Sequence, residues 1–238
     1  GTTGPPKGVV TRHSNYAFNV TSALKAVNVP RGAMFLQFLP LAHSLGRLEH
    51  FLAFDAMAVS SFARSLLTVA EDLAAVRPEI MVSVPRLYEK FYARVLAKVE
   101  EDGGLKKAIF GWALGVGREA SRCRQQGREP KGFLALKNGI ADRLVFRKIR
   151  ARMGGRLRYF ISGGAPLSRE IAEFLHAIGV LILEGYGLTE TSPVVTVRTP
   201  ESNRLGTIGR TVADTEILIV DRGTGAPVAP GGEGVIKV

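Results

Sequence analysis

The sequence predicts an α/β fold in which a parallel sheet is flanked by helices, with the start of a small β region at its C-terminal end. Short apolar runs of strand length alternate with longer segments whose apolar residues recur at helical spacing. Residues 157–183 form a strand–loop–helix–strand unit, and a unit of this length joins parallel strands by a right-handed crossover. After Pro200 the helical spacing ends, and short apolar runs surround a stretch rich in Gly and Pro.

The composition is that of an ordinary globular protein. The chain has 238 residues, of which 46% are hydrophobic and 22% are charged. This length permits one or two domains with a large core. No apolar run reaches the roughly 18 residues of a membrane-spanning helix, so none is expected. Cys123 is the single cysteine, which excludes an internal disulfide, and we expect a cytoplasmic protein.

Two strands and two helices are expected in the first 101 residues. The strands are apolar runs that end before prolines, at Met34–Leu39 and Ile80–Val84. Between them, Thr68-Val-Ala-Glu71 fits a capping box at the start of a helix that Pro78 ends. An amphipathic helix follows over Arg86–Glu101. The apolar faces of these two helices carry Val69, Leu73 and Val76, and Leu87, Phe91, Val95 and Val99.

The segment from Lys98 to Arg158 is strongly basic. It holds 16 Lys or Arg and 6 Asp or Glu residues, whereas the rest of the chain holds 16 and 15. Helical spacing over Leu105–Arg124 and Leu134–Met153 makes it an all-helical excursion at about residues 103–156. The charge fits a solvated helical face, an anionic membrane surface or the phosphates of a ligand. Peripheral membrane contact is therefore a hypothesis, and nucleic acid is not expected because no reading motif accompanies the charge.

Residues 157–190 form the most regular stretch. We expect strands over Leu157–Ser162 and Val180–Leu183, joined by a helix. A loop follows each strand, Gly163-Gly-Ala-Pro166 after the first and Glu184–Glu190 after the second. Parallel strands place both loops at the same edge of the sheet, which is where open α/β sheets bind ligands.

Short strands are also expected near the C-terminal end, over Glu216–Val220 and Gly234–Val238. Gly223–Gly232, between them, is rich in Gly and Pro and predicts a turn. We therefore divide the chain into an α/β core over residues 1–200 and the beginning of a small β subdomain over residues 201–238.

The chain opens with Gly1-Thr-Thr-Gly-Pro-Pro-Lys-Gly8. Glycines allow close approach of a backbone to a ligand, hydroxyls and amides donate to phosphate oxygens, and Lys7 adds a positive charge. The spacing does not fit a Walker A loop. These residues alone leave a phosphate-binding loop and an ordinary turn both open.

A second glycine-bearing motif is Gly185-Tyr-Gly-Leu-Thr-Glu190. The ring of Tyr186 can stack on a base, and the Glu190 carboxylate is a suitably hard ligand for Mg²⁺ beside phosphate oxygens. Taken alone, the motif is explained as well by a packed tyrosine and a solvated glutamate.

Together, T-T-G-x-P-K-G, S-G-G-A-P-L and G-Y-G-L-T-E, in this order and at this spacing, resemble the acyl-adenylate-forming superfamily. Its members include acyl-CoA synthetases, luciferases and the adenylation domains of peptide synthetases. Three stretches are similar to the long-chain acyl-CoA synthetase branch: Leu39-Pro-Leu-Ala-His-Ser-Leu-Gly46, Val84-Pro-Arg-Leu-Tyr-Glu-Lys90 and the basic excursion. The resemblance covers essentially the whole chain and implies part of the large N-terminal domain of a long-chain fatty acid–CoA ligase.

The resemblance implies two groups of ATP-binding residues and a metal site. The phosphate-binding loop, with its first threonine also near the metal, consists of Thr2, Thr3, Gly4 and Lys7. The groups around the adenine are Gly163, Gly164, Ala165, Gly185, Tyr186 and Gly187. Glu190 would be the Mg²⁺ ligand.

The resemblance also implies which residues take part in the chemistry. Thr189 would lie close to the α-phosphate and the acyl carboxylate, and His43 would lie near the reacting carboxylate. With Lys7 and Glu190 they form the implied catalytic set. The implied reaction consumes ATP and a fatty acid with Mg²⁺, forms acyl-AMP, and transfers the acyl group to coenzyme A as co-substrate. The other histidines, His13, His50 and His176, are interpreted as structural or surface residues.

Several alternatives remain open from the sequence. Another adenylate former could act on a short-chain, aromatic or amino acid, or load a carrier protein with the acyl group. A non-enzyme reading is a basic module that binds nucleic acid or membrane. The family's ribose-binding Asp and its mobile C-terminal domain with a catalytic lysine have no counterpart in these 238 residues. We therefore expect little ligase activity from the chain alone.

Overall fold

The computed structural model describes residues 8–238 and contains a seven-stranded sheet with the order β2-β1-β3-β4-β5-β6-β7. The five neighbouring strands from β2 to β5 run parallel, and β6 and β7 are antiparallel additions at one side. This confirms the predicted α/β class. The strands are β1 (Met34–Gln37), β2 (Val59–Phe62), β3 (Ile80–Ser83), β4 (Tyr159–Ser162), β5 (Ile182–Gly187), β6 (Val194–Val197) and β7 (Arg210–Thr211).

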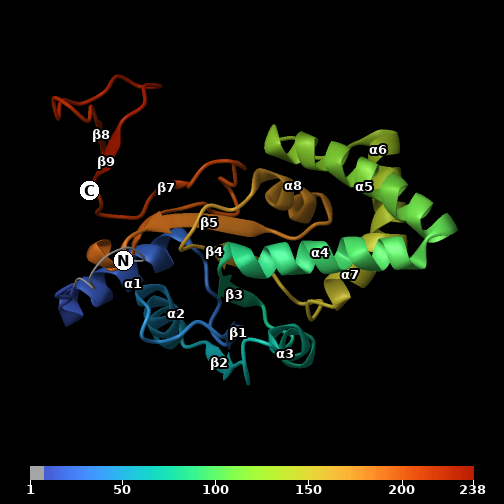
Figure 1. Cartoon of the computed structure of the whole chain (residues 1–238), viewed down its shortest axis with the longest axis horizontal. Coiled ribbons are helices and arrows are strands. Elements are labelled where there is room, and N and C mark those ends of the chain that lie inside the picture. Colours follow the sequence, from blue (N-terminus) through green and yellow to red (C-terminus); the bar gives the residue numbers. More distant parts are fainter. Residues whose placement is uncertain (1–7) are drawn as a thin grey trace.

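Helices cover both faces of this sheet (Figure 1). One face packs on α1 and α2, and the other packs on α3, α4 and α8, over which α5 lies. The helices are α1 (His13–Ala26), α2 (Ser44–Asp55), α3 (Val69–Val76), α4 (Pro85–Asp102), α5 (Gly104–Gln125), α6 (Gly132–Ala141), α7 (Arg147–Ala151) and α8 (Arg169–Ala177).

The central strands are buried on both faces, where successive side chains point to opposite sides of the sheet. In β4, Tyr159 belongs to the core under α1 and α2, and Phe160 belongs to the core under α3, α4 and α8. In β3, Ile80 and Met81 divide in the same way. This two-sided burial explains why the strands read as continuous apolar runs instead of alternating ones.

Two local expectations are wrong. Thr68 precedes α3 but makes no side-chain cap, because its hydroxyl bonds to Ser65 and Asp72, and Glu71 pairs with Arg64 instead. The single helix expected over 134–153 is also divided. A π-helical segment, Asp142–Phe146, joins α6 to α7, so the helical path continues with one wider turn.

The C-terminal part divides between two sheets. β7 belongs to the main sheet, and Val212, just after it, is buried in the core under α1 and α2. β8 (Leu218–Val220) and β9 (Val235–Lys237) pair antiparallel as a separate two-stranded sheet, at the opposite end of the molecule from α5 and α6 (Figure 1). The division of the chain near residue 200 remains a prediction. Between residues 8 and 238, no helix has the length and apolar character that crossing a bilayer requires.

Helix α5 approaches α8 closely because Gly117 has no side chain. A Cβ added to Gly117 would lie 2.6 Å from the Ala177 carbonyl oxygen and 2.8 Å from Cζ of Phe146. One turn further, the Ser121 hydroxyl lies 2.6 Å from Nδ1 of His176. Burial lowers the pKa of His176, with help from the positive charges of Arg124 and Arg198. His176 is therefore a packed side chain, as interpreted from the sequence.

Two glycines of α5 provide a matched test of this packing. We expect Gly117→Ala to lower the free energy of unfolding by about 1–3 kcal/mol, because the added methyl overpacks the contact with α8. Gly115→Ala should raise it by about 0.5–1 kcal/mol, since its Cβ would meet nothing and alanine favours helix. Urea unfolding of both variants checks this, and equal effects of the two substitutions would contradict the close contact.

Candidate active site

The site is built at the carboxyl ends of β4 and β5, which are parallel neighbours. Ser162 at the end of β4 pairs with Glu184 in β5. The Gly163 amide donates to the Ser83 carbonyl at 3.1 Å, so the loop that follows β4 is anchored to β3. Gly163 is buried, whereas Gly164 and Ala165 are exposed at the sheet edge. The loop therefore leaves an accessible backbone at the edge where the sequence predicts ligand binding.

The Gly-Tyr-Gly motif is part of strand β5, which corrects the expectation of a loop over Glu184–Glu190. β5 continues to Gly187 because it leaves its parallel partner and pairs antiparallel with β6, with Tyr186 opposite Thr196. A bulge separates Tyr186 from Gly187. A Cβ on Gly187 would overlap the Pro193 carbonyl, so the strand can turn back here only without a side chain.

A short 3₁₀ turn, Thr189–Thr191, follows β5 and presents Thr189 and Glu190 to solvent. Thr191, which the sequence analysis did not single out, holds this turn. Its hydroxyl oxygen accepts a hydrogen bond from the Leu188 amide at 2.9 Å and lies 2.8 Å from the Pro193 carbonyl. A threonine directly after Glu190, the last residue of the motif, was the only sequence signal of this role.

The start of α2 meets both of these loops. The Ser44 and Thr189 hydroxyl oxygens lie 3.4 Å apart. On the other side, Cδ2 of Leu45 lies 3.2 Å from the position that a Cβ on Gly163 would occupy. His43 is the residue before α2 and is exposed. Three segments therefore converge at this edge of the sheet, those of His43, Gly163 and Thr189. The first and the last of them are more than 140 residues apart in the sequence.

The phosphate-binding residues expected from the first motif, Thr2, Thr3, Gly4 and Lys7, lie outside the described residues. Their contribution remains a prediction, as do the roles of His43, Thr189 and Glu190. Within residues 8–238, no cluster of three His, Cys, Asp or Glu side chains could hold a metal alone. An exposed Glu190 fits Mg²⁺ in the way that ion commonly binds, through one or two carboxylates together with substrate phosphates and water.

A buried ion pair lies directly behind the site and was missed from the sequence. Nη2 of the fully buried Arg198 lies 3.0 Å from Oε2 of Glu184, while Oε1 of Glu184 accepts from the Leu167 amide at 3.1 Å. Nη1 of Arg198 donates to the Arg204 carbonyl at 3.3 Å. Burial lowers the pKa of Arg198, and the Glu184 charge opposes this effect. The pair ties the Gly163–Leu167 loop to β5 and to the end of β6.

An apolar pocket lies beneath α2, between it, α1 and the sheet. The pocket is narrow, with about 30 Å³ of room for a water-sized group. Leu45 belongs to this pocket and also contacts Gly163, so the pocket adjoins the loops described above. The lining residues are Ala23, Leu24, Val27, Val29, Phe35, Leu45, Leu48, Glu49, Leu52, Val82, Ile161, Val194 and Val197.

Glu49 is the one polar side chain in that lining. Its Oε1 accepts from the Val82 amide at 3.2 Å, where β1 and β3 have separated after a single registered pair, Phe35 with Ile80. Burial raises the pKa of Glu49 well above its ordinary value, against the opposing effect of the Val82 hydrogen bond. Burial therefore favours the protonated, uncharged form of this carboxyl group.

The buried pair gives a prediction about stability. Arg198→Leu should lower the free energy of unfolding by about 3–5 kcal/mol, because it leaves the Glu184 carboxylate buried without its partner. Adding Glu184→Gln should recover part of this loss, since the amide still accepts from Leu167 without a charge. Urea unfolding of the two variants tests both expectations.

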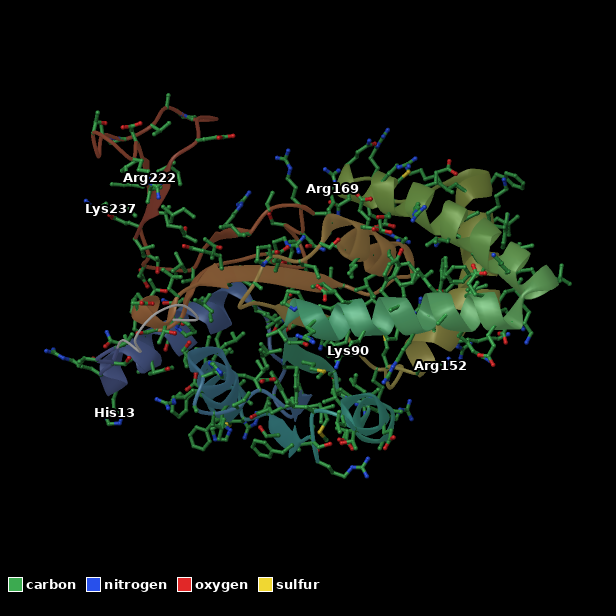
Figure 2. All side chains as sticks on the ribbon, in the orientation of Figure 1. His13, Lys90, Arg152, Arg169, Arg222 and Lys237 are labelled. Carbon is green, nitrogen blue, oxygen red and sulfur yellow. The ribbon has the colours of Figure 1, made fainter. Side chains whose placement is uncertain are left out.

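A matched control is Arg169→Leu, which breaks the exposed ion pair with Glu173 at the surface of α8, where Figure 2 labels Arg169. It should cost less than about 1 kcal/mol. An effect of Arg198→Leu no larger than that of this control would show that the buried pair does not hold the loop.

Comparison with known proteins identifies relatives of this arrangement. The family model described as AMP-binding enzyme matches residues 1–238. The peroxisomal long chain acyl-CoA synthetase 6 of Arabidopsis thaliana is 38% identical over 228 residues, which cover 93% of this chain and 30% of that protein. The chloroplastic long-chain-fatty-acid–[acyl-carrier-protein] ligase AEE15 of the same plant is 31% identical over 262 residues, which cover 100% of this chain and 36% of that protein. The chain thus spans about a third of the length of these curated relatives.

The fold is also shared with solved structures. ATP-bound MatB from Rhodopseudomonas palustris superposes with a TM-score of 0.67 over 99% of this chain and 37% of that protein, at 22% identity. Since the family model spans all 238 residues, the chain belongs to the AMP-binding enzyme family.

Proposed function

We propose that the protein carrying this chain activates a long-chain fatty acid with ATP and transfers the acyl group to coenzyme A. The observation that carries the long-chain part is the similarity to long chain acyl-CoA synthetases, and the apolar lining of the pocket beneath α2, which adjoins the converging loops through Leu45, supports it. A carboxylate placed between His43, Gly163 and Thr189 would direct its tail toward this narrow pocket, whose side chains would have to move apart to hold it. The burial that raises the pKa of Glu49 supports the proposal, because it favours the uncharged acid beside a hydrocarbon tail.

In the proposed first step, a carboxylate oxygen of the acid attacks the α-phosphorus of ATP, and the bond to the leaving pyrophosphate breaks. The chain's part is to align two anions and to offset their repulsion. Thr189 would donate to the carboxylate or the α-phosphate, and Lys7 and Thr2 would bind the phosphates. Glu190 would hold Mg²⁺, which when bound neutralises phosphate charge.

Tyr186 and the exposed backbone of Gly164 and Ala165 would contact the adenine and hold the α-phosphate in place. In the second step the thiol of coenzyme A attacks the acyl carbon, loses its proton, and displaces AMP. Both steps need only bound substrates, so no covalent enzyme intermediate is invoked. Cytoplasmic localisation and low activity of these 238 residues alone remain predictions.

The second candidate is an acyl-AMP ligase that loads a carrier protein. It is favoured by the match to the acyl-carrier-protein ligase of Arabidopsis thaliana, which covers the whole of this chain. The two candidates share the first half-reaction and differ in the acceptor thiol. Single-turnover transfer from preformed acyl-AMP to free coenzyme A or to a carrier protein, measured on the full-length protein, distinguishes them.

The pocket predicts a chain-length effect. On the full-length protein, Leu24→Trp should lower the ratio of kcat/KM for a C16 acid over a C8 acid roughly tenfold, since each CH₂ excluded from the pocket forfeits about 0.8 kcal/mol. The control is Leu114→Trp, a half-buried helical leucine on the opposite face of the sheet. If the wild-type protein preferred acids of about six carbons or fewer, which have few CH₂ groups to bury, the long-chain proposal would be refuted.

Glu190 provides a test of the metal site. Glu190→Gln should reduce fatty-acid-dependent ATP–pyrophosphate exchange by roughly 10²–10³-fold, because one group that stabilises developing charge is lost. The concentration of Mg²⁺ needed for half-maximal exchange should rise with it. Glu201→Gln, an exposed glutamate outside the site, is the control. An unchanged Mg²⁺ requirement in Glu190→Gln would exclude Glu190 as the ligand.

A further inference from the structure

Helix α6 exposes an apolar stripe to solvent. Phe133, Leu136 and Ile140 are spaced by three and four residues and are 69%, 61% and 44% exposed. Leu144, in the following π-helical segment, continues the stripe and is 47% exposed. The helix is not merely loose, because its other side packs on the core through Leu134 and the buried Ala141. A fixed helix with large apolar side chains on its outer side is typical of a docking surface.

Positive charge surrounds the stripe. Residues 131–148 contain one acidic residue, Asp142, which pairs with Arg150 at 2.7 Å. Nζ of Lys137 lies 4.4 Å from the ring centroid of Phe133. Across residues 8–238, no carboxylate lies within ion-pair distance of the five basic residues of this stretch. These are Lys131, Lys137, Arg143, Arg147 and Lys148.

The surface lies away from the site. Figure 1 shows α5, α6 and α7 at one end of the molecule, with the small β8–β9 sheet at the other. Arg152, labelled in Figure 2, lies just after α7 at the helical end, whereas Arg222 and Lys237 mark the β8–β9 end. The start of α2 contacts the loops of the site, and Figure 1 shows α2 far from α6, so a partner bound to α6 would leave the loops after β4 and β5 uncovered.

We propose that α6, together with the π-helical segment, docks on the surface of an anionic lipid bilayer. Phe133, Leu136, Ile140 and Leu144 would enter the boundary between headgroups and acyl chains, as the apolar face of an interfacial helix does. The long stems of the flanking Lys and Arg side chains would extend to the lipid phosphates. This places the membrane contact hypothesised from the basic segment on one defined helix face.

The apolar stripe and its basic rim disfavour two other partners, nucleic acid and a second copy of the chain. Nucleic acid would use the positive charges but would leave the apolar stripe without a function. A second copy of the chain would bring two basic rims of the same sign together, and none of the five cations has a carboxylate partner nearby to relieve the repulsion. An anionic bilayer complements both the stripe and its rim.

The test is co-sedimentation of the full-length protein with vesicles. Binding to phosphatidylcholine vesicles that contain phosphatidylglycerol should exceed binding to phosphatidylcholine alone, and salt should weaken it. Phe133→Gln combined with Leu136→Gln and Ile140→Gln should reduce the vesicle partition coefficient at least about tenfold. Lys137→Glu combined with Arg143→Glu should remove the preference for the anionic lipid.

Two control variants match these changes elsewhere on the surface. Leu66→Gln combined with Leu67→Gln alters exposed apolar side chains before α3, and Arg222→Glu alters an exposed charge near β8. Both should leave partitioning unchanged, and all variants should retain the wild-type circular dichroism and ATP–pyrophosphate exchange rate in vesicle-free buffer.

Absence of binding to the anionic vesicles at low salt would overturn the proposal. So would binding that the α6 variants do not reduce. A third contrary result would come from gel filtration. If the α6 variants eluted as a smaller assembly than the wild type but still bound vesicles equally well, the stripe would be a contact between protein surfaces. Because exchange without vesicles is measured in parallel, failure of the membrane proposal is separable from failure of the proposed ligase activity.

Discussion

The buried pair of Glu184 and Arg198 is the interaction on which the geometry of the site depends. One carboxylate accepts from the Leu167 amide and from Arg198, so the loop after β4, strand β5 and the end of β6 are held by a single group. Both charges are out of water, so each requires the other and neither can move alone without a large desolvation cost. That requirement converts two glycine-bearing segments, flexible by composition, into a fixed frame.

The frame explains how β5 serves two partners. Its first half pairs parallel with β4, and its second half, carrying Tyr186 and Gly187, pairs antiparallel with β6. A strand that outlasts its parallel neighbour extends beyond the sheet edge, where the crevice of an open α/β sheet lies. Thr189 and Glu190 then leave this extension toward the start of α2, and the 3.4 Å approach of Ser44 to Thr189 closes the other side.

Local patterns predicted β1, β3, β4 and the first half of β5 because these strands are apolar on both faces. They missed the parallel edge strand β2, Val59–Phe62, because its two central serines and its partial exposure leave no apolar run. The features that escaped prediction depend on partners distant in the chain or on local competition. Gly-Tyr-Gly is a strand because β6 returns to pair with it, and glycines carry no strand signal by themselves. Thr68 did not cap α3 because Asp72 and Ser65 engaged its hydroxyl. Glu184 was interpreted as the start of a loop because a charged residue directly follows an apolar run there. The sequence gives no sign that this charge pairs with a buried arginine 14 residues later.

The basic excursion differs from the site in that, among the described residues, the positive charges around α6 lack acidic partners. Unpaired like charges repel one another and lower the stability of a compact state, so the cations around α6 do not serve the fold. The exposed stripe they surround is likewise unfavourable in water, because about 25 cal/mol is forfeited for each Å² of apolar surface left uncovered. Two unfavourable features lie on one helix face, which Leu134 and Ala141 hold outward, and a surface that is anionic outside and apolar beneath would compensate both of them. A lipid bilayer has that structure.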